Sequence, residues 1–133
     1  MIEIIIYTIC FVLYSCLEGF REGLYFHYKT GGNLIPVKLN EHIEFAVQRG
    51  IVLFIIGYSS NWIYVIGLAL IFPFFHDGIY YLTRNKLNNT IYLKGFLDNP
   101  SNTSTAVMDF NLITRSLMFI IGLVIIVIKY MDT

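Results

Sequence analysis

The segments LMFIIGLVIIVI at residues 117–128 and IYVIGLALIF at residues 63–72 contain no charged side chain. Across the whole chain of 133 residues, hydrophobic residues make up 56% and charged residues only 14%. This composition is far more apolar than that of an ordinary soluble domain. Roughly 20 apolar residues in a helix cross a bilayer core about 30 Å thick. The sequence therefore predicts an integral membrane protein.

Four apolar stretches of suitable length follow one another along the chain. The predicted spans are residues 2–27, 41–58, 61–82 and 107–130. They leave little chain for a separate soluble domain, so residues 1–133 are expected to form one domain. The predicted fold is an all-α, polytopic membrane protein, in which four transmembrane helices form an up-and-down bundle.

The basic residues of the loops predict an orientation. The connections at residues 28–40 and 83–106 carry most of the lysines and arginines, whereas the N-terminus and the turn at residues 59–61 carry none. Basic loops stay in the cytoplasm, so both termini should be extracytoplasmic. We expect a bacterial inner membrane or a phage-associated membrane. The formal net charge is zero, and no basic run indicates binding to nucleic acid.

Charged and histidine side chains gather toward the cytoplasmic end of every span. At about 1.5 Å of rise per residue, positions 18, 42, 76 and 115 all lie about 22–24 Å from the outer ends of their spans. Groups at this depth usually face the interior of a bundle. The sequence therefore predicts one shared polar layer. Its candidate residues are Glu18, Arg21, Glu22, His42, Glu44, Arg49, His76, Asp77, Arg84, Asp109 and Arg115.

The first interpretation of this layer is a network of ion pairs that fixes helix packing. Four acids are matched by four arginines: Glu18, Glu22, Asp77 and Asp109 against Arg21, Arg49, Arg84 and Arg115. The planar guanidinium of arginine binds carboxylate or phosphate at two points. This pattern favours a structural or interaction role, with membrane lipids as partners and a lipid headgroup or another anion as a ligand.

The second interpretation is a metalloprotein or metalloenzyme. Carboxylates and imidazoles on facing helices are the ligands of many metal sites in helical bundles. The candidate ligands are Glu18, Glu22, His42, His76 and Asp77. The neighbouring arginines would compete for the carboxylates. We therefore expect no resident cofactor, and keep a divalent metal as the alternative.

Two further interpretations stay open. Glu18, His42, His76 and Asp77 are titratable groups suited to a channel, a transporter or a proton relay, although the outer half of the bundle is almost wholly apolar. His76 with Asp77, or His42 with Glu44, would serve as an acid/base pair in a metal-free enzyme. Adjacent helical residues point about 100° apart, so no direct bond between His76 and Asp77 is expected. Whether the chain is an enzyme is left undecided.

Small residues and a proline add two structural predictions. Ser15, Gly19 and Gly23 form a small-residue ridge beside the glutamates, which favours close helix packing within the bundle or in a homo-oligomer. Pro73 removes a backbone donor, and Gly78 weakens the same helix. Together with the adjacent histidine and aspartate, they predict a functional kink.

Overall fold

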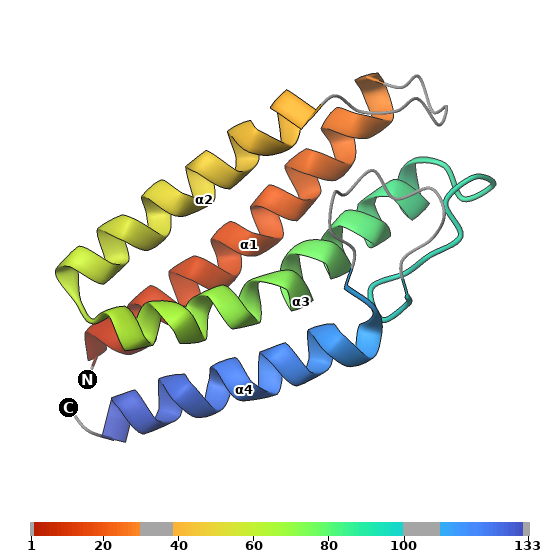
Figure 1. Ribbon diagram of the computed structural model, residues 1–133. Coiled ribbons are helices and arrows are strands. Elements are labelled where there is room, and N and C mark those ends of the chain that lie inside the picture. Colours follow the sequence, from red (N-terminus) through yellow and green to blue (C-terminus); the bar gives the residue numbers. More distant parts are fainter. Residues whose placement is uncertain (1, 30–38, 100–109, 132–133) are drawn as a thin grey trace.

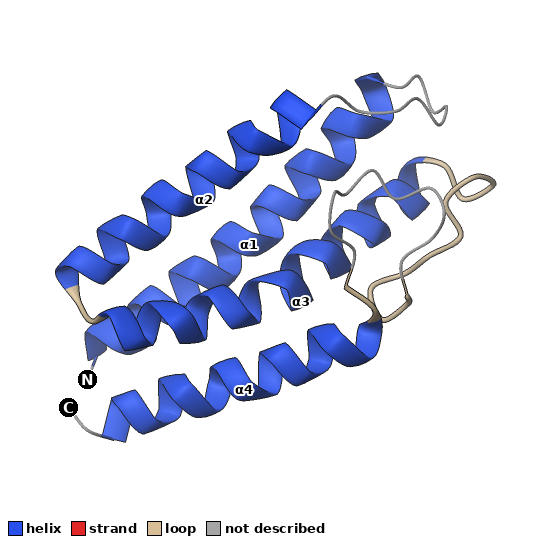
Figure 2. Cartoon of the chain, in the orientation of Figure 1, coloured by secondary structure: helices blue, strands red, loops and turns tan. Residues whose placement is uncertain are grey.

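The structure is a computed structural model that describes residues 2–29, 39–99 and 110–131, without the side chains of residues 29 and 39–42. These residues form four helices, and no strand occurs among them (Figures 1 and 2). The helices are α1 (Ile2–Lys29), α2 (Leu39–Ser59), α3 (Trp62–Leu87) and α4 (Leu112–Met131). The predicted all-α class and four-helix bundle are confirmed.

The third helix is the centre of the bundle. α3 packs closely against α1 on one side and against α4 on the other (Figure 1). α2 runs alongside α1, and the start of α1, the turn from α2 to α3 and the end of α4 lie together at one end of the molecule. The chain therefore runs up and down, as the four spans predicted.

The observed boundaries agree well with the first two spans and differ in the last two. α3 continues past residue 82 to Leu87. α4 begins at Leu112, not at residue 107, because Asn111 caps it: the Thr114 amide donates to Asn111 Oδ1 at 2.8 Å. Residues 110 and 111 are not helical, and residues 107–109 lie outside the described chain.

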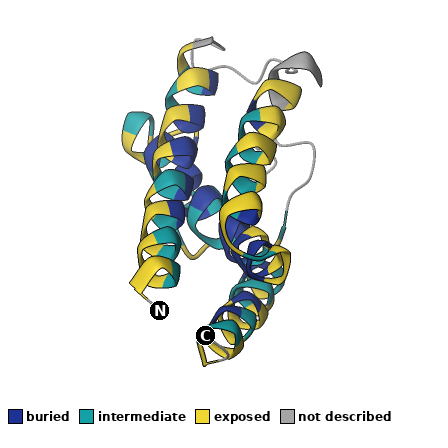
Figure 3. Cartoon of the chain, turned by 90° about the vertical axis from the view of Figure 1, so that its left-hand side faces the viewer, coloured by how far each residue is buried: buried dark blue, intermediate teal, exposed yellow. Residues whose placement is uncertain are grey.

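The outer faces of the bundle are suited to lipid. α1, α3 and α4 are each long and apolar enough to cross a membrane. Among the described residues α2 is not one of these three helices, and Glu44 and Arg49 lie in its first half. Large apolar side chains such as Ile9, Ile55 and Ile120 are exposed, and the buried residues form stripes between the helices (Figure 3). A soluble monomer rarely exposes so much apolar surface.

Glycines bring the central helices together. A methyl group at Gly19 would collide with the backbone carbonyl of His76, and one at Gly23 would lie 3.1 Å from Thr83. Ser15 at the head of the same ridge is fully buried. The ridge of Ser15, Gly19 and Gly23 is thus covered by α3 within one chain. It is not an open surface for a second copy, so the predicted homo-oligomer has no support from this ridge.

The proline and glycine for which a functional kink was predicted do not interrupt α3. α3 runs unbroken through Pro73. Gly78 has a packing role, because a methyl group there would lie 2.6 Å from the ring of Phe96. The segment after α3 therefore folds back against the helix, and Phe96 also packs edge-on against Phe74.

Two apolar clusters leave a polar layer between them. The cluster nearer the chain termini contains Phe11, Tyr64, Leu68, Ile71, Phe72 and Ile126. The cluster nearer the other end contains Phe26, Phe45, Tyr80 and Tyr81. On α1 and α3 the residues between these clusters include Glu18, Glu22 and His76, which are all buried. The fold thus encloses ionisable groups in an apolar core.

Candidate functional site

Two glutamates on α1 form one side of the site. Glu18 and Glu22 are one helical turn apart and therefore lie on the same face of α1. Each residue is only 4% exposed. Gly19 lies between them and allows α3 to approach, so both carboxylates point into the space between α1 and its neighbours. An isolated carboxylate in such surroundings is very costly, and these two require cationic partners.

Arg49 brings a positive charge from α2 to both glutamates. Its Nε donates to Glu18 Oε1 at 2.6 Å, and its Nη2 lies 3.4 Å from Glu22 Oε2. The guanidinium carbon also lies 4.7 Å from the ring centroid of Phe72, within the range of a cation–π contact. One side chain of α2 therefore contacts α1 and α3 together.

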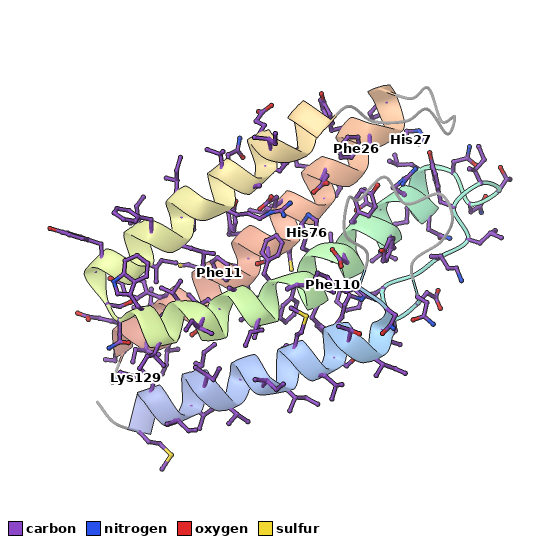
Figure 4. The ribbon with its side chains drawn as sticks, in the orientation of Figure 1. Phe11, Phe26, His27, His76, Phe110 and Lys129 are labelled. Carbon is purple, nitrogen blue, oxygen red and sulfur yellow. The ribbon has the colours of Figure 1, made fainter. Side chains whose placement is uncertain are left out.

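His76 completes the site from α3. Its Nε2 lies 2.7 Å from Glu22 Oε2, and its Nδ1 lies 2.8 Å from Asp77 Oδ1. The imidazolium has an N–H on each ring nitrogen and is the form that donates to both carboxylates. Phe72 stacks on the ring at a centroid distance of 4.8 Å. Figure 4 places His76 inside the bundle, midway along its length.

The direct bond between His76 and Asp77 corrects the sequence-based expectation. Adjacent helical positions do point in different directions. Nδ1 is the ring nitrogen nearer the backbone, however, and the aspartate side chain is short, so the two atoms meet across that angle at 2.8 Å. The carboxylate thereby fixes the orientation of the imidazole.

These five residues, Glu18, Glu22, Arg49, His76 and Asp77, are called the central cluster below. Their side chains connect three helices through hydrogen bonds between charged groups. Such bonds are stronger than neutral ones, and loss of one partner leaves a buried charge uncompensated. The cluster therefore links α1, α2 and α3 through side-chain contacts.

Arg21 lies beside the central cluster, on the outer side of α1. It is exposed, its Nη2 donates to Gln48 Oε1 at 2.7 Å, and its guanidinium lies 4.9 Å from the ring centroid of Phe45. Arg21 lines two cavities between α1 and α2, of about 190 Å³ and about 110 Å³. Glu44 is exposed and lines the smaller one.

Arg84 lies about two helical turns beyond the central cluster on α3. The residue is 2% exposed, and its Nη1 donates to the hydroxyl of Tyr80 at 2.7 Å. Its guanidinium carbon lies 3.9 Å from the ring centroid of Tyr92, in the segment that follows α3. Arg84 therefore fixes this segment against the end of α3 by a hydrogen bond and a cation–π contact.

Arg115 does not reach the central cluster. It is fully buried in the first turn of α4, where its Nη2 donates to the carbonyl oxygens of Phe96 at 3.2 Å and Asp98 at 2.8 Å. The guanidinium also lies 5.5 Å from the ring centroid of Tyr81. Within the described part of the chain, this arginine anchors the segment between α3 and α4 instead of pairing with an acid.

The structure thus brings together five of the predicted site residues. Glu18, Glu22, Arg49, His76 and Asp77 meet, whereas Arg21, Glu44, Arg84 and Arg115 lie around or beyond them. The side chain of His42 and the whole of Asp109 lie outside the described residues. The predicted single layer is therefore a central cluster on three helices, with separate arginine contacts nearer the loops.

Three residues that contact or line the site were not predicted from the sequence. Gln48 binds Arg21, Phe72 lies against both Arg49 and His76, and Tyr14 lines the larger cavity beside Glu18. The spacing of two of them could have indicated this. Phe72 lies four residues before His76, and Tyr14 lies four residues before Glu18, so each shares a helix face with a member of the cluster.

No family model, curated protein or solved structure matches this chain. The central cluster can hold three helices in register, bind a cation between its carboxylates, or exchange a proton between His76 and Glu22. The geometry supports these roles to different degrees.

Proposed function

We propose that the chain is a small integral membrane protein with a structural or interaction role, in which the central cluster fixes the packing of its helices. The observation that carries the proposal is Arg49, which donates to Glu18 at 2.6 Å and approaches Glu22 at 3.4 Å. Besides its apolar contacts through Phe45 and Ile56, α2 is joined to α1 by this charged side chain. The position of α2 therefore depends on this arginine.

A stability measurement tests the role of the cluster. Glu18→Gln removes the charge that binds Arg49 and should lower the free energy of unfolding in mixed micelles by roughly 1–3 kcal/mol, because hydrogen bonds to charged groups contribute about that much. Glu44→Gln is the matched control, since Glu44 is exposed and should change stability by less than about 0.5 kcal/mol. Equal effects of the two variants would contradict the proposal.

We further propose that Arg21 binds the phosphate of a membrane lipid. Its guanidinium is exposed between two cavities of about 190 Å³ and about 110 Å³, and its hydrogen bond to Gln48 uses Nη2. Arginine forms strong bonds with phosphate oxygens. At about 1.5 Å of rise per residue, Arg21 lies about 28 Å from the outer end of its predicted span, at the level where headgroups begin.

Native mass spectrometry from vesicles that contain phosphatidylglycerol tests lipid binding. Arg21→Gln should reduce the fraction of protein that retains a lipid. Lys86→Gln is the control, because Lys86 is an exposed cation near the same end of the bundle. If both variants retain lipid as the unmodified chain does, Arg21 is not a lipid site.

The alternatives of transport by an oligomer and metal-free catalysis stay predictions.

A further inference from the structure

We infer that Glu18, Glu22 and His76 form a binding site for one divalent transition-metal ion, with Asp77 as the residue that orients the histidine ligand. The three side chains come from two adjacent helices and are all buried. Each offers one ligand atom, and these atoms lie within 4.8 Å of one another. The inference goes beyond helix packing, because it assigns a ligand to the same cluster.

The orientation of His76 matches that of a metal-binding histidine. Its Nε2 faces the glutamates, and its Nδ1 lies 2.8 Å from Asp77 Oδ1. Histidines that bind metals through one nitrogen commonly donate the other N–H to a carboxylate, which fixes the tautomer and makes the ligand more basic. Asp77 is placed to do this for a metal at Nε2.

Glu18 offers an oxygen that the ion-pair network does not use. Its Oε1 accepts from Arg49, whereas its Oε2 is buried, lies on the carboxylate beside the Tyr14 hydroxyl, and has no hydrogen-bond partner within bonding geometry among the described residues. A buried carboxylate oxygen without a donor is unfavourable, and a cation would compensate it. Arg49 can therefore stay bound to Oε1 when Oε2 binds a metal.

The distances require only small side-chain movements. Zn²⁺ binds nitrogen and oxygen ligands at about 2.0–2.2 Å, which places tetrahedral ligands about 3.4 Å apart. The present atoms lie within 4.8 Å of each other, and His76 Nε2 lies 2.7 Å from Glu22 Oε2. Shifts of roughly 1 Å or less at each carboxylate would reach the metal-bound arrangement, and these lie within the range of carboxylate torsions.

The charge of the cluster also favours a divalent cation. The described groups that face one another are the carboxylates of Glu18, Glu22 and Asp77, the guanidinium of Arg49 and the ring of His76. With an imidazolium, three negative charges face two positive ones. Replacement of the proton on His76 Nε2 by a divalent ion makes the group neutral. Net charge is costly in an apolar core, so the metal-bound form is electrostatically favoured.

The donor set selects the class of metal. One imidazole and two carboxylates suit Zn²⁺, Mn²⁺ or Fe²⁺, whereas Mg²⁺ and Ca²⁺ prefer oxygen ligands alone. Zn²⁺ is the practical probe because it has no redox chemistry.

Calorimetric titration of the metal-free full chain in detergent micelles with Zn²⁺ tests the site. We expect saturation at one ion per chain, loss of this binding in His76→Gln, and affinity about 10- to 100-fold lower in Asp77→Asn. His27→Gln and Glu44→Gln are matched controls, since both residues lie outside the group, and they should bind as the unmodified chain does.

X-ray absorption of the zinc-loaded, unmodified chain gives a result that does not depend on the folding of any variant. One imidazole with oxygen ligands and no sulfur is expected. The absence of saturable zinc binding, sulfur ligation by Cys10 or Cys16, or equal loss in the two controls would overturn the inference. If zinc fails to bind while Glu18→Gln still destabilises the metal-free chain, the metal site is refuted and the structural role stands.

Discussion

Gly19 of α1 lies directly against the backbone carbonyl of His76 on α3, where no side chain would fit. This contact sets the separation of the two helices at the level of the central cluster. Glu18 precedes Gly19 and Glu22 follows it by one turn, so the glycine determines how far both carboxylates lie from the imidazole. Close backbone packing and the polar contacts are therefore one structural feature.

A methyl group at position 19 should disrupt this feature. Gly19→Ala should lower the free energy of unfolding by about 1–3 kcal/mol, because the colliding atom belongs to the backbone and cannot rotate away. Gly50→Ala on α2 is the matched control. A methyl group there has no neighbour within 4 Å and should be neutral or stabilise the helix by at most about 1 kcal/mol. Unfolding in mixed micelles measures both, and equal losses would refute the packing role of Gly19.

Arg115 should hold the segment between α3 and α4 in place. Its Nη2 donates to the carbonyl oxygens of Phe96 and Asp98, so Arg115→Gln should release this segment. Loss of about 1.4 kcal/mol of local stability would raise amide exchange near Phe96 and Asp98 about tenfold. Hydrogen exchange with mass spectrometry measures the effect, with Lys86→Gln as control. Unchanged protection near Phe96 would show that the arginine is not the anchor.

The orientation expected from the basic loops predicts which end of the helix bundle reacts with a reagent added outside the cell. In a chain with Cys10→Ser and Cys16→Ser, a cysteine introduced as Ser60→Cys should react with a membrane-impermeant maleimide in intact cells. Lys86→Cys should react only after the membrane is opened, because the basic loops are expected in the cytoplasm. Ser60 and Lys86 are both exposed, so burial does not explain a difference. Labelling of Lys86→Cys in intact cells would show that the orientation is the opposite of the predicted one.

Hydropathy was sufficient to predict the helices, because length and apolar composition determine which segments cross a bilayer. It was less informative about where they end. Asn111 caps α4 after the predicted start, and the cap depends on a local side-chain bond that hydropathy does not include. α3 likewise continues to Leu87, beyond the predicted end at residue 82, and its C-cap residue Asn88 donates its backbone N–H to the carbonyl oxygen of Arg84.

The members of the central cluster were predicted, but their pairing was not. Spacing places Glu18 and Glu22 on one face, yet it gives no register between helices. That register depends on the contact of Gly19 with His76, which no periodicity reveals. Arg115 was expected in the same layer because its depth is similar. It lies elsewhere because the segment containing Phe96 folds back and presents two carbonyl oxygens to it.

The central claim is that Arg49 holds α2 to α1 through Glu18. A double-mutant cycle with Glu18→Gln, Arg49→Gln and the double variant, measured by unfolding in mixed micelles, tests this claim most directly. The structure predicts a favourable coupling energy of about 1 kcal/mol or more, because Arg49 Nε and Glu18 Oε1 lie 2.6 Å apart. A coupling energy below about 0.3 kcal/mol, with additive effects of the two substitutions, would contradict it.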